Sequence, residues 1–567
     1  MQSSPSVLAQ VKRDIAGCVM RAISTAQDKG ELPKDVAIEV KMEIPSRPEQ
    51  GDFATGVAMT LGRQVKSDGR TVAGTIIRHL NIDDSPVVRV DIAGPGFLNF
   101  FLDTSWLKKA MARVWAEGPS YGRTDYLNGQ KILLEFVSAN PTGPLNVVNA
   151  RAAAVGDCLA SMLEMAGAEV AREFYVNDAG TQTDRLGDSL EARYRQALGQ
   201  ESPLPEDGYK GEYLKDLAAT LAAEKGSSLL DLPDEERQAF FKDYALSEIQ
   251  GWQKKTLKDY GLIFDLWFSE KSLRDAGAHN EVVEFFREKG LTYEKDGAIW
   301  FKSTEFGDDK DRVLVRSDEN ASTTYIVPDL AYHKNKLERG FNHLIDILGP
   351  DHHGYVSRLS AGLMGLGYPK DVLEVLIVQV VRLVRDRELV KMSKRGGEFI
   401  SMDELLEEVG KDAARFFFLM RSPESHLDFD IDLARLQGNE NPVFYVQYAH
   451  ARIASIFRQA KDDGLKFAMG PNEIDFSLLR DASELALMKI IAAFPEEVYE
   501  IAKAREPNRL VKYMMDLATA FHGFYTRCRV LGDDSDLTAA RLYLAKLAQI
   551  VLANALRLIG VSAPDKM

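Results

Sequence analysis

Cysteine is scarce in this sequence, and long apolar runs are missing. The three cysteines, Cys18, Cys158 and Cys528, lie far apart in helical patterns, which argues against a disulfide framework or a zinc site and for a reducing cytoplasm. No run of about 18 apolar residues occurs, so no membrane span is expected. The N-terminus lacks the apolar core and cleavage pattern of a secretory signal. We therefore expect a cytoplasmic protein.

Net positive charge is also missing. The formal net charge is −15, so overall electrostatics give no support for nucleic-acid binding, although a local basic face can still contact phosphates. Apolar residues, in contrast, are plentiful. They make up 45% of the 567 residues, which is enough for sizeable cores in about two to four domains.

The stretch from residue 131 to residue 175 organises the rest of the chain. Residues 132–137 and 170–176 are short runs rich in strand formers, and residues 138–144 have the composition of a loop. A helical period begins near Asn146, so the stretch predicts a parallel βαβ unit. The helix N-terminus at its junction suits a phosphate. An ordinary crossover without a ligand has the same pattern, and neither GxGxxG nor a P-loop occurs here.

This junction resembles a known family. EFVSANPTGPL, a four-residue box and ARAAAVGD are similar to the first signature of class I aminoacyl-tRNA synthetases, and specifically of arginyl-tRNA synthetase. The family box is His-Ile-Gly-His or a close relative, whereas residues 146–149 are Asn-Val-Val-Asn. Asparagine keeps an N–H donor for a phosphate but carries no charge. In the family, adenine packs where this box has Val148, and a branched side chain would crowd it.

Residues 390–397, VKMSKRGG, form the strongest motif. Lys391 and Lys394 are three apart on a loop that ends in glycine, so both ammonium groups can reach one polyphosphate and stabilise a pyrophosphate leaving group. KMSKR resembles the second class I signature. A solvated basic loop is the alternative.

Carboxylates are expected opposite an arginine substrate, because a guanidinium is a planar fork of donors. Glu135 breaks an apolar strand where an unpaired carboxylate would be unfavourable. Tyr325 and Asp329 are four apart and could share one helix face. The resemblance assigns these three to the arginine side chain and Asn140 to its backbone groups. For Glu135 alone, an ion pair with an arginine of this chain is equally plausible.

The first 115 residues have the pattern of a separate α+β module. GDFAT and GPGFLNFFL are similar to the N-terminal domain of arginyl-tRNA synthetases, which contacts the tRNA elbow. The resemblance gives Phe97 a stacking role and Asn99 a base-reading role. The alternative is that Phe97 is core and Asn99 ends a strand.

The C-terminal part is helical, and NPVFYVQYAHARI at 441–453 resembles the start of the family's anticodon-binding domain. Tyr445, Gln447, Tyr448 and Arg452 could stack on and read unpaired bases. Helix-surface aromatics are more often core residues, and a helical bundle is expected.

Three further segments carry structural predictions. Residues 51–55 are expected to open a helix, residues 323–327 to form a strand, and residues 373–384 to form one buried strand. The loop Gly-Pro-Asp-His-His-Gly at 349–354 follows a strand. It lacks the further ligands that a metal site would need, and the resemblance places it beside ATP and arginine.

The expected fold is an α/β Rossmann-like parallel sheet with an N-terminal α+β domain and a C-terminal all-α bundle. The predicted domains are 1–115, 116–425 with a helical insertion at about 180–275, and 426–567. The insertion is acidic and charged, so most of it is expected to be solvated.

The resemblance implies that ATP and L-arginine form arginyl-adenylate and that tRNA(Arg) accepts the arginyl group. Mg²⁺ would accompany ATP, with no permanently bound metal, and the chain would be a monomer. The alternatives are a non-catalytic tRNA-binding paralogue and an ATP-dependent ligase or nucleotidyltransferase with another acceptor. The expected ATP contacts are Pro144, Asn146, Asn149, Gly156, Asp351, His352, Lys391, Met392, Ser393 and Lys394. The expected arginine contacts are Glu135, Ser138, Asn140, Tyr325, Asp329 and His352, and the catalytic set is Lys391, Lys394, Asn146 and Asn149.

Overall fold

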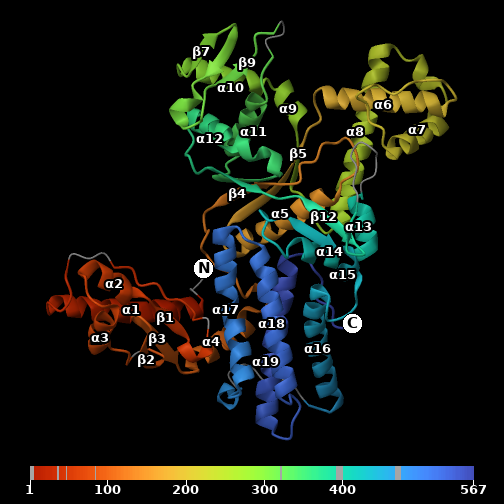
Figure 1. Cartoon of the computed structure of the whole chain (residues 1–567). Coiled ribbons are helices and arrows are strands. Elements are labelled where there is room, and N and C mark those ends of the chain that lie inside the picture. The colour runs from red at the N-terminus through yellow and green to blue at the C-terminus, as the bar shows by residue number, and fades with distance from the viewer. Residues whose placement is uncertain are drawn as a thin grey trace.

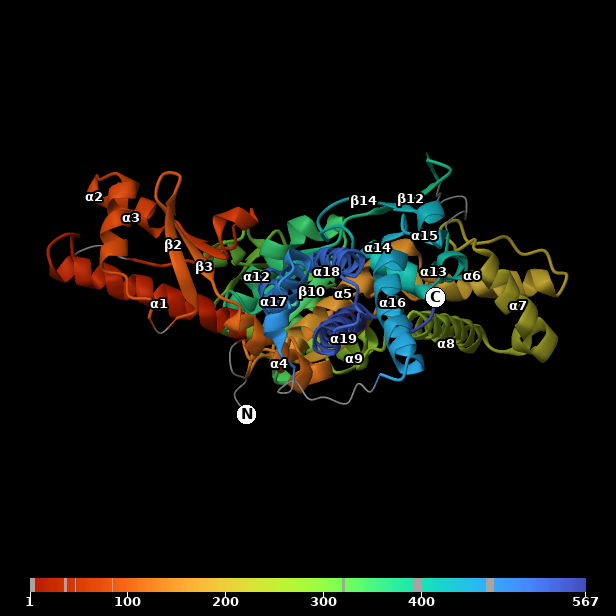
Figure 2. The ribbon, with the colours of Figure 1, turned by 90° about the horizontal axis from the view of Figure 1, so that it is seen from below.

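The computed structural model describes residues 6–34, 38–45, 47–83, 85–318, 322–390, 400–465 and 474–567. These residues form an N-terminal α+β domain, a central α/β domain with a helical insertion, and a C-terminal helical bundle (Figure 1). Seen from below, the N-terminal domain and the insertion lie at opposite ends of the molecule (Figure 2). The predicted fold class is confirmed.

A three-stranded antiparallel sheet forms one side of the N-terminal domain. Strand β3 lies between β1 and β2. Leu98 and Phe100 of β3 are fully buried in the core, because alternate residues of a strand point to the same side. The elements of this domain are α1 (Val7–Asp28), β1 (Phe53–Thr55), α2 (Val57–Val65), α3 (Gly69–Arg78), β2 (Val87–Ala93), β3 (Phe97–Leu102) and α4 (Ser105–Glu117).

The predicted helix start at residues 51–55 is wrong. Phe53–Thr55 is strand β1, and α2 begins only at Val57. The N–H of Asp52 donates to Phe100 O, and its carboxylate accepts the N–H of Leu102, both at 2.8 Å. These bonds hold the segment against β3.

The central sheet has five parallel strands in the order β11-β10-β4-β5-β6. Helix α5 (Val147–Met165) connects β4 to β5, so the predicted βαβ unit is confirmed. From β4 the chain first continues to β5 on one side and later adds β10 on the other side of β4. The strand order therefore reverses between β4 and β10, and in open parallel sheets ligands bind at such a switch point. The strands are β11 (Leu373–Ile377), β10 (His343–Leu348), β4 (Lys131–Glu135), β5 (Glu169–Val176) and β6 (Leu266–Ser269).

Helices and a small antiparallel sheet cover one side of the central domain. The small sheet is an antiparallel meander, in which β8 pairs with both β7 and β9. The strand predicted at 323–327 is wrong: Thr323 makes one isolated bridge to Val315, and α11 begins at Ile326. The elements are α9 (Glu270–Asp275), α10 (Ala278–Glu288), β7 (Thr292–Lys295), β8 (Ala298–Phe301), β9 (Arg312–Val315), α11 (Ile326–Glu338) and α12 (Val356–Gly365).

Residues 373–384, predicted as one strand, belong to two different sheets. The chain leaves β10 after β11 and pairs with β14 as β12. Between them, Val378 N–H donates to Leu348 O and Gln379 N–H to Pro423 O, at 2.8 and 2.9 Å, so the backbone changes partner here. The elements that follow are β12 (Val381–Arg385), β13 (Glu388–Leu389), α13 (Met402–Val409), α14 (Lys411–Phe418), β14 (Leu427–Asp430) and α15 (Ile431–Arg435).

The insertion has a small core of its own. Its helices are α6 (Thr181–Ala197), α7 (Glu212–Lys225) and α8 (Asp234–Asp259). The core residues include Leu186, Leu190, Tyr194, Phe241 and Ile249.

The C-terminal bundle consists of α16 (Pro442–Asp462), α17 (Ala482–Ala504), α18 (Asn508–Arg527) and α19 (Ser535–Leu558). By length and composition alone α19 could cross a membrane, but 72% of its most apolar window is buried in the structure, as in a core helix. The N-terminal domain contacts α17 through Glu496. Its carboxylate accepts the Ser6 hydroxyl at 2.7 Å and lies 3.6 Å from Lys12 Nζ.

Candidate active site

The turn after β4 is held in a strained backbone conformation. Val137 and Ser138 have φ of +69° and +36°, a region that disfavours branched side chains and costs of order 1–3 kcal/mol. Ser138 Oγ donates to Glu135 Oε1 at 2.9 Å and accepts the N–H of Tyr175 at 3.1 Å. Ser138 therefore ties the turn to both neighbouring strands.

The unusual box at 146–149 forms a reciprocal cap on α5. Asn146 Oδ1 accepts the N–H groups of Val148 and Asn149, and Asn149 Oδ1 accepts the N–H of Asn146 at 3.0 Å. Both amide oxygens are thus used by the backbone. Within the described residues neither Nδ2 has a hydrogen-bond partner, so the amides retain donors for a ligand.

A cavity of about 1190 Å³ lies in front of this cap. The signature loop and the cap form one wall, and the insertion forms the other. Val148 is half-buried in the cap wall. The lining includes Asn140, Pro144, Asn146, Val148 and Asn149 on the first wall, and Arg185, Tyr209, Lys210 and Tyr213 on the second.

The insertion holds the signature loop by its carbonyl groups. Gln253 of α8 is buried, and its Nε2 donates to Asn140 O at 3.2 Å and to Gly143 O at 3.0 Å. Tyr213 Oη donates to Thr142 O. The sequence prediction of a mostly solvated insertion missed this role, because the contacts join residues far apart in the chain.

Three carboxylates lie side by side on adjacent strands of the sheet. Glu135 of β4 is in register with Asp346 of β10 on one side and with Glu173 of β5 on the other. All three side chains are buried. Like charges on neighbouring strands destabilise a sheet, so these groups need cations.

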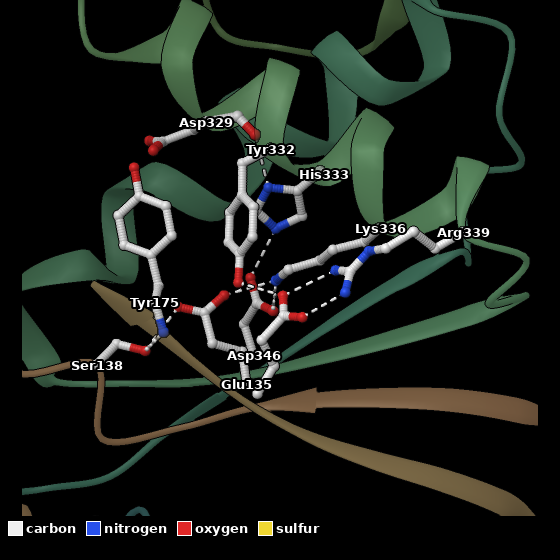
Figure 3. Close-up of polar contacts among 10 residues, drawn as sticks. Glu135, Ser138, Tyr175, Asp329, Tyr332, His333, Lys336, Arg339 and Asp346 are labelled. Carbon is white, nitrogen blue, oxygen red and sulfur yellow. Dashed lines mark hydrogen bonds and ion pairs between the residues drawn. The ribbon is translucent and has the colours of Figure 1, made fainter. Parts of the chain in front are cut away.

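Helix α11 supplies the cations (Figure 3). Lys336 is fully buried, and its Nζ lies 2.5 Å from Glu135 Oε2 and 2.9 Å from Asp346 Oδ1. His333 Nδ1 faces Asp329 O and its Nε2 faces Asp346 Oδ2, both at 2.7 Å. Both ring nitrogens therefore lie within hydrogen-bond distance of oxygen atoms.

Glu173, the third carboxylate, also has a basic partner. Arg339 donates to both oxygens of Glu173 at 2.6 and 2.9 Å. Tyr332 Oη donates to the same carboxylate at 2.6 Å. The alternative for Glu135, an ion pair with an arginine of this chain, is wrong about the residue type: the partner of Glu135 is Lys336.

Burial and charge oppose each other in this cluster. Burial raises the pKa of Glu135 against the attraction of Lys336. Burial also raises the pKa of Asp346, but Lys336 and His333 together outweigh it and lower that pKa. Asp346 is hydrogen-bonded to both Lys336 and His333, whereas Lys336 is the basic side chain bonded to Glu135, which explains the difference. Burial lowers the pKa of Lys336, but Asp346 and Glu135 outweigh it and hold the value at about 12.

Asp329 differs from the other carboxylates. Tyr355 Oη donates to its Oδ2, but within the described residues no cationic side chain pairs with it. Burial raises the pKa of Asp329. The Tyr175 ring packs at a tilt against Tyr332 with centroids 4.5 Å apart and directs its hydroxyl toward Asp329 (Figure 3). The neighbouring acid Glu270 pairs with Arg274 at 2.6 Å.

Two of the predicted arginine contacts need comment. The Tyr325 residue is 82% exposed, and the Tyr355 hydroxyl contacts both its backbone carbonyl, at 3.4 Å, and the Asp329 carboxylate. The role of Tyr325 in binding arginine stays a prediction. Asn140 lies in the cavity wall. Tyr175, Lys336 and Asp346 border the site but were not predicted from the sequence.

Some predicted ATP contacts are packed into the fold, and others lie outside the described residues. Gly156 is in α5, where a Cβ would lie 2.3 Å from the Phe136 ring, so the glycine allows close packing there. Its contact with ATP stays a prediction. Asp351 is exposed in the turn after β10. The residues outside the description are Lys391, Met392, Ser393 and Lys394, together with the side chain of His352.

The predicted anticodon residues divide into two groups. Tyr445, Tyr448 and Arg452 lie together on α16. The His522 ring is tilted against Tyr445 with centroids 4.8 Å apart, and the Arg452 guanidinium is 4.6 Å from the centre of the Tyr448 ring. A base contact stays a prediction for Gln447, which is only 8% exposed. Its Nε2 donates to Asp412 Oδ2, Ser562 O and Ser562 Oγ at 2.9–3.2 Å.

Phe97 and Asn99, the residues predicted to contact the tRNA elbow, are less exposed than stacking on an unpaired base requires. Phe97 is half-buried, and Asn99 is only 5% exposed. Asn99 points to the sheet face opposite Leu98 and Phe100, away from the core. Their role stays a prediction.

Comparisons with known proteins follow the same domain order. Residues 11–102 match the arginyl tRNA synthetase N terminal domain, and residues 446–567 match the DALR anticodon binding domain. Residues 113–421 match the catalytic domain of tRNA synthetases class I (R). The catalytic match covers more than half of the chain and defines a class I aminoacyl-tRNA synthetase.

Individual relatives specify the family. The arginine–tRNA ligase of Moorella thermoacetica is 48% identical, covering 99% of this chain and 100% of the relative. That of Bacillus subtilis is 46% identical over 98% of both chains. The solved arginyl-tRNA synthetase of Thermus thermophilus shares the fold, with a TM-score of 0.73 at 23% identity over 98% of this chain and all of that one. The chain belongs to the arginyl-tRNA synthetase family.

Proposed function

We propose that this chain activates L-arginine with ATP and transfers the arginyl group to the 3′ end of tRNA(Arg). The carboxylate of arginine attacks the α-phosphate of ATP, and pyrophosphate leaves as arginyl-adenylate forms. A ribose hydroxyl of the tRNA then attacks the arginyl carbonyl, and AMP leaves. Both steps depend on positioning and on stabilising charge.

One observation carries the amino-acid assignment. Glu135, Glu173, Asp346 and Glu270 each have a cationic partner in the protein, whereas Asp329 has none among the described residues. A buried carboxylate without a cation is unfavourable. A substrate guanidinium supplies the missing charge, with Asp329 as its main anchor and Glu135 as a second acceptor.

The nucleotide lies at the α5 cap in this proposal. The Nδ2 groups of Asn146 and Asn149 donate to phosphate oxygens, helped by the helix N-terminus. Lys391 and Lys394 stabilise the pyrophosphate as it leaves, and Mg²⁺ enters with ATP as part of the substrate.

For tRNA, support comes from the surface of α16. Beside Tyr448 and Arg452 is a cavity of about 1000 Å³ whose lining also includes Arg527, Arg529 and Lys566. Aromatic and cationic side chains together suit unpaired anticodon bases and their phosphates. Because one chain carries all three domains, the proposed working unit is a monomer, and its proposed location is the cytoplasm.

ATP–pyrophosphate exchange with arginine, with and without tRNA(Arg), tests the function. Exchange that depends on arginine, together with charging of tRNA(Arg), is the expected result. Tight tRNA binding without exchange would support the non-catalytic paralogue instead. Exchange with another acceptor substrate would support the other ligase.

A further inference from the structure

The buried ammonium group of Lys336 has no role in the chemistry described above. It lies 201 residues from Glu135 in the chain, yet it contacts Glu135 and Asp346 at once. The Tyr332 ring also faces it at 4.2 Å. A fully buried lysine is rare and needs charge compensation.

The contact leaves the two oxygens of Glu135 in different situations. Oε2 is occupied by Lys336, and from the part of the chain that the structure describes Oε1 accepts a single bond, from Ser138. A carboxylate oxygen can accept two hydrogen bonds. Oε1 is therefore the atom that remains for a substrate, and Lys336 and Ser138 together fix its direction.

Helix α11 couples this pair to the rest of the arginine site. Asp329, His333 and Lys336 are spaced i, i+4 and i+7, so they follow one face of the helix. His333 links the Asp329 backbone to Asp346. Lys336 clamps the same face to Glu135, so the two proposed arginine carboxylates are held at a fixed separation.

We propose that Lys336 is a positioning residue for arginine recognition, which acts by keeping Glu135 ionised and aiming its Oε1 into the site. This inference rests on the proposed role of Glu135. Without Lys336, Glu135 and Asp346 would be adjacent buried anions, and one of them would take up a proton. We expect Glu135 to take up the proton, because Asp346 keeps its hydrogen bond with His333.

A double-mutant cycle tests the proposal. In Lys336→Met we expect the arginine KM in ATP–pyrophosphate exchange to rise about tenfold or more, with the ATP KM within about twofold of wild type. In Glu135→Gln we expect a rise of similar size. Because Lys336 acts through Glu135, adding Lys336→Met to Glu135→Gln should change the arginine KM by less than about twofold.

A pH series adds a readout that a packing role would not change. The titratable and charged groups around Glu135 come from every element packed against it: Lys336, His333 and Tyr332 from α11, Asp346 from β10, Glu173 and Tyr175 from β5, and Ser138 from its own loop. In Lys336→Met, raising the pH ionises Glu135 again, so the ratio of variant to wild-type arginine KM should fall toward one. Asp329 titrates in both proteins and cancels in this ratio.

Lys334→Met is the matched control. Lys334 is on the outer side of α11, where it pairs with Glu338 at 2.6 Å, and its arginine KM should equal that of wild type. Thermal unfolding of every variant separates recognition from folding. If Lys336→Met does not fold, Lys336→Gln keeps a donor without the charge, and the same cycle and pH series apply.

The outcomes separate the two claims. An unaltered arginine KM in Glu135→Gln would remove Glu135 from the proposed function, and the inference with it. A raised KM in Glu135→Gln with an unaltered KM in Lys336→Met would overturn only the inference. Fully additive effects, or a deficit that does not change with pH, would also overturn it and assign Lys336 to packing.

Discussion

At the N-terminus of α5 the polar side chains that line the cavity are neutral amides. At α11 and the residue that follows it, the basic side chains of His333, Lys336 and Arg339 pair with three buried carboxylates beside the proposed arginine site. The first region obtains its geometry from backbone hydrogen bonds in a reciprocal cap. The second obtains it from buried ion pairs. Both arrangements fix the directions of side chains, but only the ion pairs at α11 also keep the side chains in their charged forms.

This difference predicts unequal sensitivity to substitution. Neutral hydrogen bonds contribute about 0.5–1.5 kcal/mol each, and bonds to charged groups about 1.5–3. A change at the amino-acid side should therefore affect the reaction more than a change at the nucleotide side. The predictions below are ordered by that expectation.

Asp329→Asn should have the largest effect. It removes the carboxylate of the site that has no cationic partner among the described residues, so we expect the arginine KM to rise about 100-fold, equivalent to about 3 kcal/mol, with little change in tRNA affinity. ATP–pyrophosphate exchange at varied arginine measures it. Glu338→Gln, on the exposed side of the same helix, is the control. Equal arginine dependence in both variants would refute the assignment.

The pH dependence of arginine binding should report the same carboxylate. Burial raises the pKa of Asp329, and arginine requires the ionised form. Affinity is therefore present above that raised pKa and is lost as the pH falls through it, at a higher pH than an ordinary aspartate would show. Comparing arginine KM profiles of wild type and Asp329→Asn checks this. A profile of the same shape in both would assign the titration elsewhere.

Replacing Asn146 and Asn149 together by alanine should have the second-largest effect on the reaction. The double variant loses two donors to phosphate, and we expect adenylate formation to fall about thirtyfold. It also loses the cap, which lowers the free energy of unfolding by about 1 kcal/mol. Single-turnover rates and thermal unfolding measure the two effects separately.

Asn146→Ser distinguishes the cap from the ligand contact. Serine still caps a helix but has no amide donor, so the free energy of unfolding should be kept while the rate of adenylate formation falls. A serine variant with the full wild-type rate would show that the amides only cap the helix.

A triple variant with histidine at positions 146 and 149 and with Val148→Gly addresses the case in which the parent chain forms no adenylate. Recovery of adenylate formation in that variant would favour the non-catalytic tRNA-binding paralogue.

The sequence allowed much of this arrangement to be predicted, but only through local signals. The βαβ unit followed from hydrophobic periods, and Glu135 followed from an acid in an apolar strand. Asp346 and Glu173 are likewise acids within strands, HLIDIL and EVAREFYV, but only Glu135 was predicted to contact the substrate. The polar stripe at 329, 332, 333 and 336 also has helical spacing.

Contacts between distant segments could not be predicted in this way. The pairing of Glu135 with Lys336 depends on the strand order and on how α11 packs against the sheet, which no local pattern specifies. The same holds for Gln253, whose helix lies in an insertion that reads as charged and solvated. It holds for Gln447 too, whose helix face is covered by α14 and the C-terminal tail.

Gln253→Met tests how far the insertion positions the loop, and its effect should be smaller again. The variant loses the bonds to Asn140 O and Gly143 O but keeps the side-chain volume. We expect kcat for activation to fall about three- to tenfold, with the unfolding temperature lowered only slightly. Lys255→Met, exposed on the same helix, should resemble wild type. An unchanged kcat in Gln253→Met would mean that the loop keeps its geometry without this contact.

Val148→Gly should have the smallest effect, and its sign is informative. Val148 lies in the first turn of α5 beside the cap, half-buried in the cavity wall. Glycine there lowers helix stability by up to about 1 kcal/mol, so the unfolding temperature should fall slightly. If the valine crowds adenine, the ATP KM should stay similar or fall, because the base can approach the helix backbone. A clearly higher ATP KM at unchanged arginine KM would mean that adenine packs on the valine side chain, and that the neutral box is a working nucleotide site in its own right.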